Sequence, residues 1–276
     1  MGQQLRRSIA AALWCLVLCG PLLAAPPDLL AEARRLFAAG RFDEAIATAE
    51  LARALPAHAA SARIIVGRAR LELYRLGGRP EDLDAAREAL RDLDPAPLPA
   101  RERTELIVGL GTTLYFEQEY GASAEVFDGI VERATELGPS ARHQVLDWWA
   151  TAVDRDAQLR AGPERDASYE VLAARMMTEL QRDETCAPAS FWIAAASRAR
   201  GDLDRAWDAA LAGWLRAAFT EGGGAALRAD LDLLVLQGII PDRARRAGGT
   251  PQDIEKTVTA LAEEWESFKS RWTSRE

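Results

Sequence analysis

The sequence predicts an all-α protein, an array of antiparallel helical hairpins that ends in a C-terminal capping helix. Three observations lead to this prediction. Ala, Leu, Arg and Glu dominate the 276 residues, and all four favour helix. Strand patterns are nearly absent. Three separated segments share one order of residue types: a helix with small residues on one face, a polar turn with an aromatic residue or leucine, and a second helix opened by a small residue.

The N-terminal segment, residues 1–25, has the three-part pattern of a secretory signal peptide. Arg6 and Arg7 form a short positive region, residues 8–18 form an apolar stretch, and small residues precede a cleavage point at Ala25. The apolar stretch is short for a membrane span. We therefore expect the protein to be exported to the periplasm or the cell envelope.

Two other fates of this segment stay open. An uncleaved signal would serve as a membrane anchor. Leu16-Val17-Leu18-Cys19 also resembles the motif for lipid attachment, which would take place at Cys19. The formal net charge is −8, and losing the two arginines of the signal makes it more negative. An acidic chain with mixed signs argues against nucleic-acid binding, and against membrane binding other than through the N-terminus.

The first and last of the three segments are the most alike. They span Ala31–Leu55 and Ala189–Ala217, with turns that begin at Gly40 and Gly201. Aligned on these glycines, the two turns share one pattern: glycine, a charged residue, a bulky apolar residue, aspartate, a charged residue, and the alanine that opens the second helix. Small residues on the helices allow two backbones to approach closely, and bulky ones fill the space towards the next hairpin.

The middle segment, Thr104–Ala134, keeps the pattern with two replacements. Gln118 stands where the other turns have glycine, and Ser123 stands where they have the opening alanine. Two further hairpins are expected in stretched form at Ala60–Asp94 and Ala141–Leu180. The sequence therefore predicts about five hairpins.

These segments resemble the tetratricopeptide repeat (TPR) family, in its exported bacterial form. The resemblance assigns residues 26–217 to a repeat array, and it implies a right-handed superhelix. In this family the first helix of each hairpin lines a concave face that commonly receives peptides. The matching positions in this chain are Arg34, Phe37, Arg68, Thr112, Tyr115, Trp149 and Arg198.

The residue types at these positions suit a protein or peptide partner. Arginines can pair with a carboxylate, and aromatic rings can bury apolar side chains. Packing between hairpins is an equally good explanation for each aromatic residue. The lysine and asparagine set with which some family members clamp a C-terminal carboxylate is missing, so that mode of binding is not expected.

The C-terminal region, residues 218–276, departs from the repeat pattern. Its last helix begins at Thr250-Pro251-Gln252-Asp253, a good helix start with a capping residue and a proline at the first position. Apolar residues then follow at alternating spacings of four and three, which places them on one stripe: Ile254, Val258, Leu261, Trp265, Phe268 and Trp272.

Two interpretations of this stripe remain. A helical array exposes an apolar face at its end and needs a cap, which this helix can supply. Alternatively, the spacing suits a helix that binds a partner or a second copy of the chain. Trp265, Phe268 and Trp272 would then form a second contact surface.

No pattern of catalytic or metal-binding residues stands out. Cys186 is the one cysteine beyond the signal, and the two histidines, His58 and His143, are far apart. Metalloprotease, P-loop, Rossmann and nucleophile-elbow patterns are missing. We therefore predict no enzymatic activity, no cofactor and no metal, and a scaffold or adaptor that binds a protein or peptide. The alternatives are a small-ligand binder or enzyme that uses the C-terminal region, and a homo-oligomer formed through the last helix.

Overall fold

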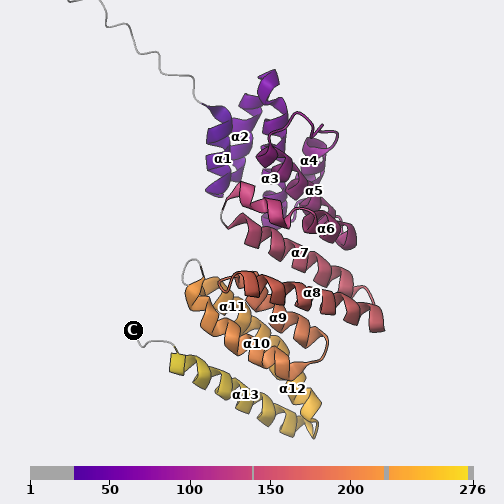
Figure 1. Cartoon of the computed structure of the whole chain (residues 1–276), viewed down its shortest axis with the longest axis vertical. Helices are drawn as coiled ribbons and strands as arrows, with labels where there is room; N and C mark the ends of the chain where they lie inside the picture. The colour runs from indigo at the N-terminus through magenta and orange to yellow at the C-terminus, as the bar shows by residue number, and fades with distance from the viewer. Residues whose placement is uncertain (1–27, 139, 221–223, 273–276) are drawn as a thin grey trace, which may run out of the picture.

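The structure is a computed structural model that describes residues 28–138, 140–220 and 224–272. These residues form an all-helical protein without a strand, in which consecutive helices pack against one another. The first helices lie at one end of the long axis and α13 lies at the other, while α11 returns beside α9 (Figure 1). The signal predicted for residues 1–25 lies outside the described residues. None of the described helices is long and apolar enough to cross a membrane.

The first ten helices form five pairs of neighbours. The pairs are α1 (Leu29–Ala38) with α2 (Phe42–Arg53), α3 (Ala59–Gly77) with α4 (Pro80–Leu90), α5 (Ala100–Phe116) with α6 (Tyr120–Asp128), α7 (Ala141–Gln158) with α8 (Gly162–Arg182), and α9 (Ala187–Ala199) with α10 (Leu203–Arg216). A 3-10 segment, η2 (Val131–Leu137), joins α6 to α7. The first helix of each pair also contacts the first helix of the next, so α1, α3, α5, α7 and α9 form one row.

Three of the turns within pairs share one backbone geometry. Gly40, Gln118 and Gly201 have φ values of +72°, +66° and +76°. The N–H of each donates to the carbonyl three residues earlier, and the next N–H donates to the carbonyl five residues earlier, all at 2.9–3.0 Å. This is the hydrogen-bond pattern that ends a helix with a left-handed residue. Gln118 therefore adopts the conformation that glycine has in the other two turns.

Replacing Gln118 with glycine is expected to raise the free energy of unfolding by up to about 1 kcal/mol. A left-handed conformation costs an L-residue about 1–2 kcal/mol. Glycine avoids this cost but loses more chain entropy on folding, which offsets part of the gain. Urea denaturation of the variant measures the change. Gly201→Ala is the matched control and should lower stability, because it places a Cβ in the same conformation. A Gln118→Gly protein that is less stable than the wild type would contradict this explanation of the turn.

The row of first helices depends on close backbone approach. A Cβ on Gly67 of α3 would lie 2.5 Å from Cγ of Leu90, and one on Gly109 of α5 would lie 2.9 Å from Cδ1 of the same leucine. Leu90 is almost completely buried. The two glycines thus make room for a side chain of α4 between α3 and α5, which sets how closely these helices pack.

The C-terminal region continues the array with shorter elements. α11 (Ala225–Leu234) is followed by a π-helical turn (Val235–Ile239), by α12 (Ile240–Ala247) and by α13 (Pro251–Trp272). The predicted start of the last helix is confirmed. The N–H of Thr250 donates to Asp253 Oδ2 at 3.1 Å, and the N–H of Asp253 donates back to Thr250 Oγ1 at 3.3 Å. This reciprocal pair is a capping box.

The apolar stripe of α13 packs against the preceding helices mainly through Trp265. Trp265 has no exposed surface, and its ring lies 5.9 Å from that of Trp207 and 5.5 Å from that of Trp214, both on α10. Its Nε1 donates to Asp232 of α11 at 2.7 Å. Trp265 is therefore part of the core and is not available as a contact surface, whereas Trp272 is 60% exposed. Phe268 is partly buried against the same cluster.

Candidate functional site

A cavity of about 650 Å³ lies against the row of first helices. Its walls come from α1, α3, α5 and α7, with contributions from the turn after α1 and from the end of η2. This volume falls in the range of roughly 300–1,000 Å³ that is usual for ligand sites. The cavity contains four of the seven predicted groove residues: Arg34, Phe37, Arg68 and Thr112.

Two predicted aromatic residues lie elsewhere. Tyr115 is not in the cavity wall, and its ring contacts those of Tyr120 and Trp148, with centroids 5.3 and 5.2 Å apart. Trp149 is 6% exposed and belongs to a core cluster shared by η2, α7, α8 and α9. The prediction of Trp149 as a groove residue is wrong, because the phase of α7 turns its side chain into the core. Its neighbour Trp148 lines the cavity in its place.

Arg198 is also outside the cavity. Its Nε donates to Asp242 Oδ2 of α12 at 2.7 Å. A Cβ on Gly238 would lie 2.7 Å from the same nitrogen, so glycine at that position leaves room for the arginine. Arg198 therefore links α9 to the C-terminal region, and the prediction that it lines the groove is corrected.

A buried polar cluster joins three helices beside the cavity. Arg34 of α1 donates to Glu102 Oε1 of α5 at 2.6 Å, and the hydroxyl of Ser61 of α3 donates to the other oxygen of Glu102 at 2.7 Å. The carboxylate of Glu105 lies 3.8 Å from Arg34. The cavity-lining charge of Arg34 is thus already used to hold α1, α3 and α5 together.

Seven charged residues line the cavity in the described part of the chain: Arg34, Arg68, Arg75, Arg101, Glu72, Glu105 and Asp147. Five of them form ion pairs, namely Arg34 with Glu102 and Glu105, Arg101 with Glu105, and Arg75 with Glu72. The other two, Arg68 and Asp147, have no oppositely charged side chain within 4.0 Å among the described residues. Within the described ranges the wall therefore keeps one positive and one negative charge without an ion-pair contact.

Arg68 lies on α3, with its guanidinium carbon 4.7 Å from the centroid of the Phe37 ring. Burial lowers the pKa of Arg68 from its usual value, while the nearby carboxylates of Glu105 and Glu72 act in the opposite direction. A guanidinium stays protonated at neutral pH even so. Arg68 is thus a charged group that has lost part of its water and still has donors free, which suits a carboxylate or phosphate.

Asp147 lies on α7, and its Oδ1 accepts a hydrogen bond of 2.8 Å from Nε1 of Trp192. Loss of hydration raises the pKa of this carboxyl group, the Trp192 hydrogen bond lowers it, and the nearby carboxylate of Asp230 raises it again. Asp230 on α11 also lacks a cationic partner among the described residues. This part of the wall attracts a positive group.

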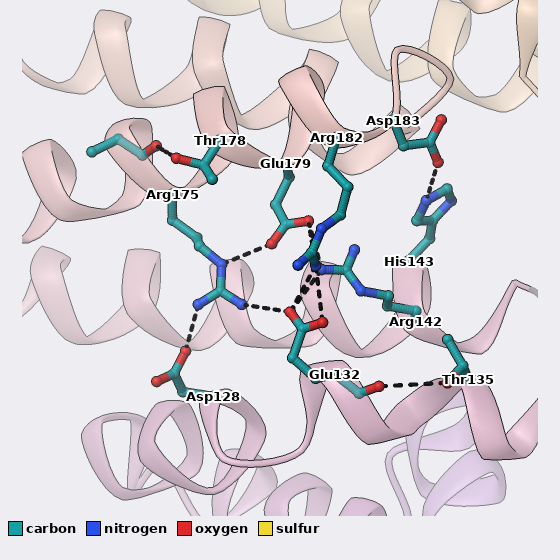
Figure 2. A network of polar contacts seen from close by, with 11 residues as sticks. Asp128, Glu132, Thr135, Arg142, His143, Arg175, Thr178, Glu179, Arg182 and Asp183 are labelled. Atoms are coloured by element: carbon teal, nitrogen blue, oxygen red, sulfur yellow. Dashed lines mark hydrogen bonds and ion pairs between the residues drawn. The ribbon is translucent and has the colours of Figure 1, made fainter.

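A second set of charged side chains lies on η2, α7 and α8, where positive and negative groups pair with each other (Figure 2). Glu179 of α8 lies 2.6 Å from Arg142 of α7 and accepts from Arg175 Nε at 2.9 Å. Glu132 of η2 accepts from Arg142 at 3.0 Å and from Arg182 at 2.9 Å. These contacts fix η2, which supplies part of the cavity wall, to α7 and α8. The network therefore positions the wall and keeps its own charges paired.

His143 and Cys186, two residues with reactive side chains, occupy structural positions. His143 contacts Asp183 at 3.0 Å, and Cys186 is buried, which raises the pKa of its thiol to about 11. A thiol with such a pKa is protonated, and hence a poor nucleophile, at neutral pH. Within the described ranges no group of three or more His, Cys, Asp or Glu side chains could hold a metal ion.

The sequence signals for the cavity were incomplete. Asp147 and Trp148 were missed as wall residues, because neither position stands out in the repeat pattern. Arg68 was found through its position on the first helix of a pair. Comparisons of the chain with protein-family models, with curated proteins and with solved structures found no match.

Proposed function

We propose that this chain is a non-enzymatic scaffold or adaptor of the tetratricopeptide type, which binds a peptide segment of a partner protein in the cavity between α1, α3, α5 and α7. The observation that carries the proposal is the position of this cavity. It lies on the row of first helices, where the resemblance predicts the groove, and it contains four of the predicted residues.

Two features support the repeat architecture within this proposal. The turns at Gly40, Gln118 and Gly201 share one geometry, so that three pairs are joined in the same way. Contacts between helices run from each pair to the next along the chain, as in an array in which each unit packs on its neighbours. A right-handed superhelix with a capping α13 is the fold we propose from these features.

The proposed site of action is the periplasm or cell envelope, on the basis of the signal pattern in residues 1–25. Fractionation of cells that express the tagged full chain tests this. We expect a shortened protein outside the cytoplasm. A full-length protein confined to the cytoplasm would contradict export.

Selection of short peptides from a display library, followed by affinity measurement on a variant with a blocked cavity, tests the binding function. Ala38 lines the cavity and is exposed, so Ala38→Trp should fill the cavity without disturbing the core. We expect this change to weaken the selected peptides at least about tenfold, which corresponds to about 1.4 kcal/mol.

The matched control is Leu159→Trp. Leu159 is 74% exposed at the end of α7 and does not line the cavity, so the same bulk is added elsewhere. We expect this variant to bind like the wild type. Peptides that bind Ala38→Trp as tightly as the wild type would show that the cavity is not the site, and a library that yields no binder would contradict peptide binding itself.

A further inference from the structure

Opposite charges remain unpaired on two walls of the same cavity. Arg68 comes from α3 and Asp147 from α7, and α5 contacts both of these helices. The two charges do not pair with each other, although every other charged residue of the wall has an ion-pair partner. Arg68 is half-buried and Asp147 is exposed, so a ligand in the cavity can reach both groups. Each of the two groups is therefore ready for a counter-charge from a ligand.

Each group is also held so that it can accept such a partner. The guanidinium carbon of Arg68 lies 4.7 Å from the centroid of the Phe37 ring, and its N–H groups donate to no acceptor among the described residues, so they are open to a planar anion. The Trp192 hydrogen bond occupies Oδ1 of Asp147, which leaves Oδ2 as a free acceptor. Asp230 adds negative charge near Asp147. Around Arg68 the carboxylates of Glu105 and Glu72 and the guanidinium groups of Arg101 and Arg34 act in opposite directions.

We propose that the peptide bound in this cavity carries one acidic and one basic side chain, the acidic one on Arg68 and the basic one on Asp147, and that these two contacts fix the direction in which it lies. This inference depends on the proposed function, because it concerns the occupant of the same cavity. A segment in the reverse direction would bring like charges together on both walls, which disfavours it.

Double-mutant cycles between the protein and a selected peptide test the proposal. The protein variants are Arg68→Gln and Asp147→Asn, which keep side-chain size and remove one charge each. The peptide has acetylated and amidated ends, so that only side chains carry charge. In two peptide variants its acidic residue is replaced by the amide, or its arginine by uncharged citrulline. Thermal unfolding of each protein variant checks that it is folded.

We expect removal of the peptide's acidic group to weaken binding at least about tenfold to the wild type and hardly at all to Arg68→Gln, since close charge pairs across interfaces show coupling of this size or larger. Citrulline should likewise weaken binding to the wild type and not to Asp147→Asn. In the crossed combinations, Arg68→Gln with citrulline and Asp147→Asn without the acidic group, the losses of binding free energy should add. Arg216→Gln is the control, because Arg216 lies outside the cavity and has no ion pair among the described residues.

The outcomes separate the two proposals. Selected peptides that lose affinity for Ala38→Trp but show no coupling in either cycle would overturn the charge assignment and leave peptide binding in the cavity intact. Coupling with the two residues exchanged, so that the acidic group depends on Asp147, would also overturn it. Peptides that bind all cavity variants equally would instead contradict the proposed function.

Discussion

Replacing Trp265 with alanine is expected to lower the free energy of unfolding by about 3–5 kcal/mol, the range found for large aromatic residues in cores. Trp265 has no exposed surface and contacts the rings of Trp207, Trp214 and Phe268. Its loss also removes a hydrogen bond from Asp232, which keeps Lys269 at 2.9 Å. Urea denaturation of the full chain, followed by circular dichroism, measures the change.

Trp272→Ala on the same helix is the matched control. Trp272 is 60% exposed, and exposed substitutions usually change stability by less than about 0.5 kcal/mol. Equal effects of the two substitutions would contradict the proposal that α13 caps the array. Size-exclusion chromatography of Trp272→Ala tests the alternative of a homo-oligomer through the last helix, which predicts a smaller assembly for this variant.

Replacing Glu179 with alanine is expected to lower stability by about 3 kcal/mol, at the lower end of the range for breaking a buried ion pair. The side chain of Glu179 is 3% exposed, and that of its partner Arg142 is 11% exposed. The guanidinium of Arg142 would lose the closer of its two carboxylates and keep Glu132 at 3.0 Å. Equilibrium unfolding in urea again provides the measurement.

Asp128→Ala is the comparison within the same network (Figure 2). Asp128 is 52% exposed and pairs with Arg175 at 2.9 Å. Exposed ion pairs usually contribute less than about 1 kcal/mol, so this substitution should have a small effect. If removing Asp128 costs as much as removing Glu179, burial does not decide which members of the network stabilise the protein.

Local features of the fold were readable from the sequence. Gly40 and Gly201 predict left-handed turns, because glycine adopts that conformation at little cost. Thr250 and Asp253 predict the start of α13, because the capping box needs only four consecutive residues. Gln118 was found through its alignment with the two glycines, since glutamine by itself does not predict such a turn.

The site could be predicted only in part, because its charges and its walls depend on contacts between residues that are far apart in the sequence. Arg34 and Arg68 occupy similar positions, but only Arg34 meets Glu102, which lies 68 residues away. Trp148 and Trp149 are adjacent on a helix with neighbours on several sides, so hydrophobicity does not say which ring faces the cavity. Arg198 meets Asp242 through the docking of α12, for which the repeat pattern holds no signal.

A crystal structure of the protein with a selected peptide tests the central claim most directly, since it locates the bound segment. The proposed function predicts the peptide between α1, α3, α5 and α7, with an acidic side chain on the guanidinium of Arg68 and a basic side chain on the carboxylate of Asp147. A peptide bound to the exposed end of α13, or to any surface that leaves this cavity empty, would contradict the account.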